Sequence, residues 1–176
     1  DQMTSKHRFT EKILFLFLAL CWKHLKNVLK KAWMVLNMPA TEWIRPRYPH
    51  MGPWEAEIWS DFLRKTDLRF IRIDYDVKVG PGNVPPGYEE LAKLTGMDVL
   101  TKLRIDAVGE TEDEIWIFEV KPRAGRSALG QLLAYADWYM AEYRPKKPIR
   151  LAVVCRDVDR NMLEPYRRRG VKVFLV

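Results

Sequence analysis

Two carboxylates and one amine occupy neighbouring apolar stretches in the middle of the chain, at Asp106, Glu119 and Lys121. Burying such charges without partners is costly. A hard divalent cation offsets that cost, because Mg²⁺ prefers carboxylate and carbonyl oxygens and keeps water ligands. The metal would polarise a phosphodiester and lower the pKa of a bound water, while the lysine orients the water or stabilises developing charge. The alternative is an ordinary salt bridge on a strand face, because Glu-x-Lys alone is a very common sequence.

A β-hairpin is needed to bring these three groups to one face of a sheet. Alternating apolar residues predict strands over 103–108 and 115–121, and the sequence GETEDE between them predicts a turn. If the turn has an even number of residues, Asp106 shares a face with the other two groups. Its nearest partners are then around Ile117 and, diagonally, Glu119, whereas a slip of one residue would separate them.

The helix predicted over 54–66, with Pro53 in its first turn, contributes another acid. At about 100 degrees per residue, its apolar side is formed by Ile58, Trp59 and Phe62. Glu55 lies at the centre of that side, where an acid is unusual, so it is the candidate for a third acid in the site. Glu57 points away and belongs to a solvated face.

The long helix predicted over 127–143 contributes polar groups beside its packing stripe. That stripe consists of Leu129, Leu132, Ala136, Tyr139 and Tyr143. Gln131 and Tyr135 lie together at the edge of this stripe. Their polar groups either point toward a neighbouring site or simply form a solvent-exposed border of the core. Arg123 and Arg126 precede the helix, whose N-terminus suits a phosphate, although solubility alone explains these arginines equally well.

In this order, Asp106, then Glu119-Val120-Lys121, then Gln131-x-x-x-Tyr135 resemble the PD-(D/E)xK nuclease superfamily. The Gln-x-x-x-Tyr helix is most similar to the RecB-like branch of that superfamily. The resemblance implies a Mg²⁺ or Mn²⁺ site made by Asp106, Glu119 and the Val120 carbonyl. It also implies that Lys121 is the catalytic lysine. The helix acid would be Glu55, and the groups that hold substrate would be Gln131, Tyr135, Arg123 and Arg126.

The resemblance also implies the fold: an α/β, restriction-endonuclease-like αβββαβ core, with a mixed central sheet flanked by helices. The core maps onto 54–155, and a helix and a strand follow it. Ile105 stands where the motif has a proline, a change that is frequent in the superfamily. The cysteine cluster of its iron–sulfur members is absent, and so is a nucleotide-binding GxxxxGK[ST] loop. Any helicase or recombination partner would therefore be a separate chain.

Three domains are expected: an N-terminal helical extension over 1–37, a Pro-rich linker over 38–53, and the nuclease domain over 54–176. The prolines of 38–53 are equally compatible with an arm that wraps around the body. The extension begins with a basic, apolar segment whose uninterrupted apolar run, 13–22, is shorter than the roughly 20 residues that span a bilayer. Cys21 is not flanked by the small residues of a signal-peptide cleavage site.

Spaced apolar residues and lysines follow that run and predict a basic amphipathic helix, which suits a membrane surface or nucleic acid. Packing on the core, or no role at all, is the plainer interpretation. Contact with a membrane through 10–37 is therefore disfavoured here but stays open.

Composition indicates a globular, intracellular protein. The chain has 176 residues, is 48% hydrophobic, and carries a formal net charge of +7, which favours a polyanionic partner. Two cysteines are too few for a disulfide framework or a four-cysteine metal site, so we expect a reducing, cytoplasmic setting.

The sequence thus predicts a Mg²⁺-dependent deoxyribonuclease acting in repair, recombination, phage or mobile-element processing, or defence. The alternative is a catalytically inactive nucleic-acid-binding module of the same fold.

Overall fold

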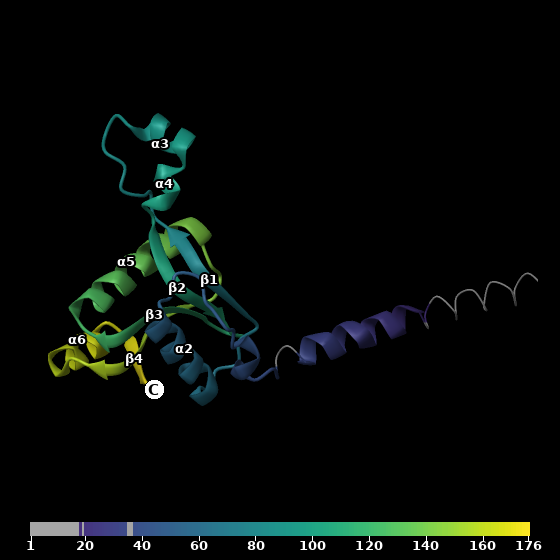
Figure 1. The fold of residues 1–176 in the computed structure, drawn as a ribbon. Helices are drawn as coiled ribbons and strands as arrows, with labels where there is room; N and C mark the ends of the chain where they lie inside the picture. The colour runs from purple at the N-terminus through teal and green to yellow at the C-terminus, as the bar shows by residue number, and fades with distance from the viewer. Residues whose placement is uncertain (1–17, 19, 35–36) are drawn as a thin grey trace, which may run out of the picture. The chain divides into compact units, whose positions relative to one another are not determined.

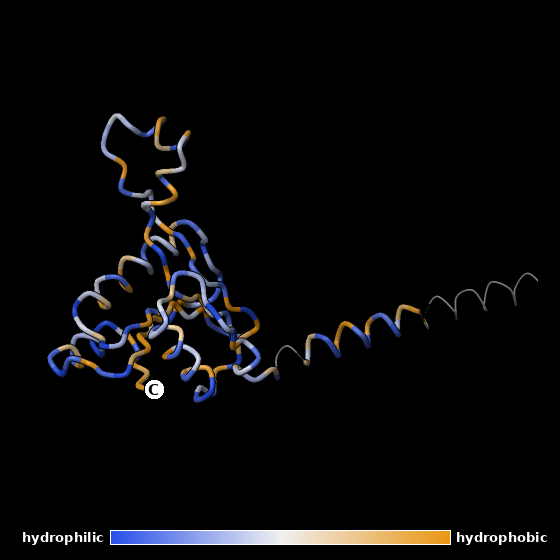
Figure 2. The backbone as a smooth tube through the Cα atoms, in the orientation of Figure 1, coloured by the Kyte–Doolittle hydropathy of each residue, from blue (hydrophilic) through white to orange (hydrophobic). Residues whose placement is uncertain are grey.

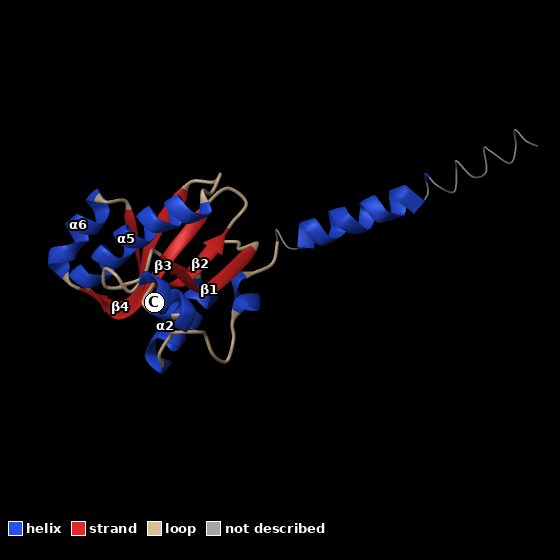
Figure 3. Cartoon of the chain, turned by 90° about the horizontal axis from the view of Figure 1, so that it is seen from above, coloured by secondary structure: helices blue, strands red, loops and turns tan. Residues whose placement is uncertain are grey.

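The computed structural model of the chain describes residues 18, 20–34 and 37–176. The chain divides into two units, Asp1–Asn37 and Met38–Val176. The second unit is an α/β structure in which a mixed sheet lies between helices, as Figures 1 and 3 show.

Five strands form the sheet in the order β1-β2-β3-β4-β5. They are β1 (Arg72–Val79), β2 (Leu103–Glu110), β3 (Ile115–Ala124), β4 (Ile149–Val158) and β5 (Val171–Leu175). The first three strands pair antiparallel, and β3, β4 and β5 pair parallel. Parallel neighbours need crossover connections. The helix α5 (Arg126–Tyr143) connects β3 to β4, and α6 (Leu163–Arg168) connects β4 to β5.

This element order agrees with the expected α/β class and mixed central sheet. The helix α2 (Pro53–Lys65) begins at the proline that the sequence indicated. Short elements that the sequence did not predict are η1 (Ala40–Trp43) and α4 (Met97–Leu100). The helix expected after the core consists of η2 (Arg160–Met162) followed by α6. A further short helix, α3 (Glu89–Thr95), precedes α4. Segments this short lack a full period of apolar residues, which explains why periodicity missed most of them.

The two faces of the sheet have different cores. On the α2 face, aromatic side chains of the helix, of the strands and of the segment that joins α2 to β1 pack together: Trp59, Phe62, Phe70, Trp116 and Phe118. The α5 face is filled mainly by aliphatic side chains, with Ile105, Ile117, Leu132, Val153 and Val171 among them. Strand alternation explains this division on β3, where Ile115 and Ile117 enter one core and Trp116, Phe118 and Val120 the other. On β2 the alternation breaks, because Ile105 lies in the α5-face core and Ala107, two residues later, in the α2-face core.

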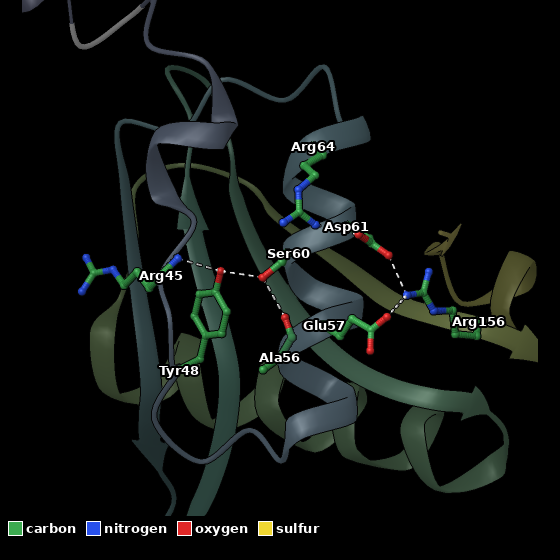
Figure 4. A network of polar contacts seen from close by, with 8 residues as sticks. All are labelled: Arg45, Tyr48, Ala56, Glu57, Ser60, Asp61, Arg64 and Arg156. Atoms are coloured by element: carbon green, nitrogen blue, oxygen red, sulfur yellow. Dashed lines mark hydrogen bonds and ion pairs between the residues drawn. The ribbon is translucent and has the colours of Figure 1, made fainter.

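Residues 38–53 form an arm rather than a linker, because they belong to the second unit and pack against its core. Ala40 and Tyr48 are buried in the aromatic cluster, and Trp43 and Met51 pack beside them. The Tyr48 hydroxyl also accepts a hydrogen bond from the Arg45 amide (3.0 Å) and lies 3.1 Å from Ser60 Oγ in α2, as Figure 4 shows. Prolines limit regular structure in this segment to the short 3-10 helix η1, and the apolar residues between the prolines pack the arm against the second unit.

A protrusion formed by α3 and α4 extends from the β1–β2 end of the sheet, at the top of Figure 1. Several of its large apolar side chains are exposed: Tyr88, Leu91, Leu94, Met97 and Leu100. Figure 2 shows hydrophobic segments, in orange, along the backbone of this protrusion. Asp106 lies on β2 close to the base of this protrusion.

In the first unit, residues 20–34 form a helix whose side chains are all exposed. The predicted apolar run at 13–22 lies mostly outside the described residues. Within the part of the chain that the structure describes, no helix is both long enough and apolar enough to cross a membrane.

Candidate functional site

The register of β2 and β3 brings the two predicted acids close together. The paired ladder ends at Ala107 and Phe118, and Asp106 and Glu119 are the next residue of each strand beyond it. The expectation that Asp106 faces Ile117 was wrong, because Ile117 pairs with Val108. The register differs because the turn is shorter than the predicted one. The Thr111 amide closes it by donating a backbone hydrogen bond of 2.9 Å to the Glu114 carbonyl. A shift of two residues keeps the face, so the predicted juxtaposition survives the correction.

Asp106 is buried, with 5% of its surface exposed. Its Oδ2 atom accepts a hydrogen bond of 2.8 Å from the backbone amide of Val120 on the neighbouring strand. Burial, with the charge of Glu119 beside it, raises the pKa of Asp106 to about 7. The sequence offered no signal for this amide as a partner, because the contact depends on the register of two strands.

Glu119 is the most deeply buried acid of the site, with 1% of its surface exposed. Its Oε1 atom lies 2.6 Å from Lys121 Nζ. Its Oε2 atom is buried and has no hydrogen-bond partner among the described residues. Burial raises the pKa of Glu119, and Lys121 and the nearby Tyr135 hydroxyl oppose that rise. An unpaired, buried carboxylate oxygen is costly, so this atom calls for a ligand or a water.

Lys121 stands between the two glutamates of the site. Its Nζ atom lies 3.9 Å from Glu55 Oε1, in addition to its close contact with Glu119. Burial by itself would lower the pKa of Lys121, but the contact with Glu119 and the charges of Asp106 and Glu55 outweigh it and raise the pKa. The amine is therefore held in its charged form beside the carboxylates.

Glu55 reaches the site from the first turn of α2, on the helix side that the sequence indicated. Its second oxygen, Oε2, accepts a hydrogen bond of 2.9 Å from the Gly52 amide. Glu55 therefore also caps its own helix, because it satisfies an amide that has no partner within the helix. The sequence did not predict this second role.

The outer side of α2 carries a separate ion-pair network, which Figure 4 shows. Arg156 of β4 contacts Glu57 at 3.3 Å and Asp61 at 2.6 Å, and Asp61 also binds Arg64 at 2.7 Å. Glu57 thus belongs to a polar surface away from Lys121, as expected.

Tyr135 lies at the centre of the packing stripe of α5, and its predicted place at the edge was wrong. The residues of α5 that are fully buried are Ala128, Leu132 and Tyr135, whereas Tyr143, predicted as part of the stripe, is 52% exposed. Burial is the main cause of the raised pKa of Tyr135, and the negative charge of Glu119 is the second cause. Gln131 Nε2 donates a hydrogen bond of 3.1 Å to the Tyr135 hydroxyl. The Tyr135 hydroxyl can be buried at this central position because Gln131 gives it a hydrogen-bond partner.

The two predicted arginines are exposed and differ in their partners. Arg123 is exposed and contacts Asp157 of β4 at 3.3 Å. Arg126 is exposed at the first residue of α5. Nothing in their contacts places either of them against the buried carboxylates.

Among the described residues, no group of three or more His, Cys, Asp or Glu side chains is arranged to hold a metal. The smaller donor set of two buried carboxylates does fit a hard cation that takes oxygen ligands and keeps waters. The unpartnered Glu119 Oε2 is the observation that supports this fit. Asp106, Glu119 and the Val120 carbonyl would hold such an ion. The carbonyl is the least supported of these ligands, because only the amide of Val120 has a contact that involves the site.

Comparison with known proteins gives no further guidance, because no protein-family model, no curated protein and no solved structure matches this chain. The function therefore has to be argued from the geometry of the site alone.

Proposed function

We propose that the chain is a metal-dependent deoxyribonuclease of the PD-(D/E)xK type, with a restriction-endonuclease-like core and a RecB-like site helix. The observation that carries the proposal is the buried pair of Asp106 and Glu119 beside Lys121, with one glutamate oxygen left without a partner. A structural salt bridge would need only one acid and one base. A second buried acid adds an electrostatic cost that a cation would offset.

The division of roles follows from the contacts. A divalent cation, when bound, supplies Lewis acidity to a phosphodiester and lowers the pKa of a water. Asp106 and Glu119 would hold it. The Val120 amide fixes the Asp106 carboxylate by its hydrogen bond, so that Asp106 needs little reorientation to act as a ligand.

Lys121 would supply positive charge where the transition state gains negative charge. Its raised pKa keeps the amine protonated at neutral pH, so it acts as an electrostatic group and a hydrogen-bond donor rather than a base. Glu55 lies on the other side of this amine and would orient it. Gln131 and Tyr135 form the wall of the site on the α5 side, and Arg123 and Arg126 would meet phosphates at the rim.

The test is cleavage of supercoiled, linear and single-stranded DNA by the full chain, with Mg²⁺ or Mn²⁺ and with EDTA. Asp106→Ala and Lys121→Ala should each reduce metal-dependent cutting about a hundredfold or more. Matched controls are Asp113→Ala and Lys65→Ala, which remove the same charges from exposed positions and should leave cutting unchanged.

A second measurement separates an enzyme from an inactive module. Mn²⁺ binding, followed by electron paramagnetic resonance, should be lost in Asp106→Ala and retained in Lys121→Ala. Cutting that survives both substitutions would overturn the assignment of the site. DNA binding without cutting, together with no Mn²⁺ binding, would favour the inactive nucleic-acid-binding module.

A further inference from the structure

The helix at 20–34 separates apolar from basic residues around its circumference. At about 100 degrees per residue, one arc of roughly 140 degrees contains only apolar residues. These are Cys21, Trp22, Leu25, Val28, Leu29, Ala32 and Trp33. The opposite side carries Lys23, His24, Lys26, Asn27, Lys30 and Lys31. Only Leu20 and Met34 break the separation.

The charge on the polar side has a single sign. No Asp or Glu occurs between Glu11 and Glu42, so the lysines of the helix have no acidic neighbours along the sequence. Lys26 Nζ lies 5.1 Å from the centre of the Trp22 ring, at the border between the two sides. Paired acids and bases, which are typical of solvated helices, are absent from residues 20–34.

The apolar arc is exposed along its whole length. Trp22 is 59% exposed, Leu29 58% and Trp33 67%. A continuous exposed apolar surface of this kind marks an interaction site, because isolated soluble helices do not gain from it.

We propose that this helix lies in the headgroup region of a bilayer that contains anionic lipids. The apolar arc would enter the boundary with the acyl chains, and the lysines would contact lipid phosphates. The two tryptophans suit the interface between headgroups and hydrocarbon, where an aromatic ring with one polar group is favoured. The helix lies on the membrane rather than through it, in keeping with its length and its lysines.

Two other partners fit the same helix less well. Nucleic acid would neutralise the lysines but leave the wide apolar arc in water. A partner helix in a coiled coil would require a narrower apolar seam flanked by charges of both signs. A fluid apolar layer beneath an anionic surface matches both sides of the helix at once. The proposal is independent of the nuclease assignment, because it uses none of the residues of that site.

Flotation of the full chain with lipid vesicles tests the proposal. Vesicles of phosphatidylcholine and phosphatidylglycerol should carry the protein, and vesicles of phosphatidylcholine alone should carry much less. Salt of about 0.5 M should weaken the binding without abolishing it, because screening affects the lysines and not the apolar arc. Failure to float with the anionic vesicles would overturn the proposal.

A matched pair of double variants tests the orientation of the helix. Leu25→Ser with Leu29→Ser removes two residues from the apolar arc and should lower vesicle binding about tenfold or more. Leu20→Ser with Met34→Ser removes apolar residues of similar exposure from the basic side and should change binding little. Equal losses in the two pairs would overturn the proposed orientation.

A further variant separates lipid from nucleic acid. Replacing Lys23, Lys26, Lys30 and Lys31 by Gln should remove the preference for anionic vesicles. If that variant lost DNA binding while the Leu25→Ser and Leu29→Ser pair retained full vesicle binding, the helix would be a nucleic-acid contact instead. Neither readout depends on cleavage, so failure here and failure of the nuclease assignment are distinguishable.

Discussion

The same strands bury different kinds of side chain on the two faces of the sheet. On the α2 face, aromatic rings pack around Phe118, whose ring centre lies 5.0 Å from that of Trp59 and 5.3 Å from that of Phe62. On the α5 face, the neighbouring residue of β3 is Glu119, which is buried beside a second acid. Adjacent residues of one strand therefore make opposite contributions to stability.

The contrast indicates how a small sheet tolerates buried charge. Apolar burial on one face stabilises the fold by about 25 cal/mol for each Å² removed from water. That stabilisation lets the other face retain carboxylates that oppose folding but would suit a cation. The following predictions measure the difference between the faces, and they run from the largest expected effect to the smallest.

Phe118→Ala should lower the free energy of unfolding by about 3–5 kcal/mol, because it leaves a cavity in the aromatic cluster of the α2 face. Urea denaturation followed by circular dichroism measures the change. The control is Trp54→Ala, which removes an aromatic ring that is 74% exposed and should cost far less. Similar losses in the two variants would show that the cluster does not carry the stability assigned to it.

Asp106→Asn should have the opposite sign in metal-free protein. An amide oxygen can still accept the hydrogen bond from the Val120 amide, while the buried negative charge is removed. At pH 8 with EDTA, we expect the free energy of unfolding to rise by roughly 1–3 kcal/mol. Asp113→Asn, an exposed turn residue, should produce no such gain.

The pH dependence of this gain follows from the raised pKa of Asp106. The folded state binds the proton more tightly than the unfolded state, so Asp106 favours folding least when it is ionised. Stability of the metal-free wild type should fall as pH rises from about 4, the ordinary value for an aspartate, to about 7. The advantage of the Asn variant should therefore disappear near pH 4. A variant less stable than wild type at pH 8 would contradict the cost assigned to this charge.

Arg156→Ala should have the smallest effect, a loss of less than about 1 kcal/mol, because its partners lie on an exposed surface. Arg156 holds the pKa of Asp61 below its usual range, so the ion pair contributes at neutral pH and is lost as pH falls through that lowered value. Denaturation at about 0.5 M salt should reduce the difference between variant and wild type further. A loss comparable to that of Phe118→Ala would overturn the view of this network as peripheral.

Local patterns in the sequence determined much of this protein. Alternation in β3 fixed which of its residues face each core, because the side-chain period of a strand is 2. Helical periodicity placed Glu55 on the inner side of α2, where it meets Lys121. Charge and apolar spacing indicated the amphipathic character of residues 20–34. Each of these features depends only on residues within a single helix or strand.

Tertiary structure decided the rest. The position of Asp106 beside Glu119, with Ile117 paired to Val108 instead, depends on the tight turn closed by Thr111 and Glu114, which composition alone did not specify. The central place of Tyr135 depends on how α5 rotates against the sheet, since a helix with apolar residues on several sides can pack in more than one orientation. The arm at 38–53 joined the core because its isolated apolar residues found partners on α2, a contact between segments that no local pattern encodes.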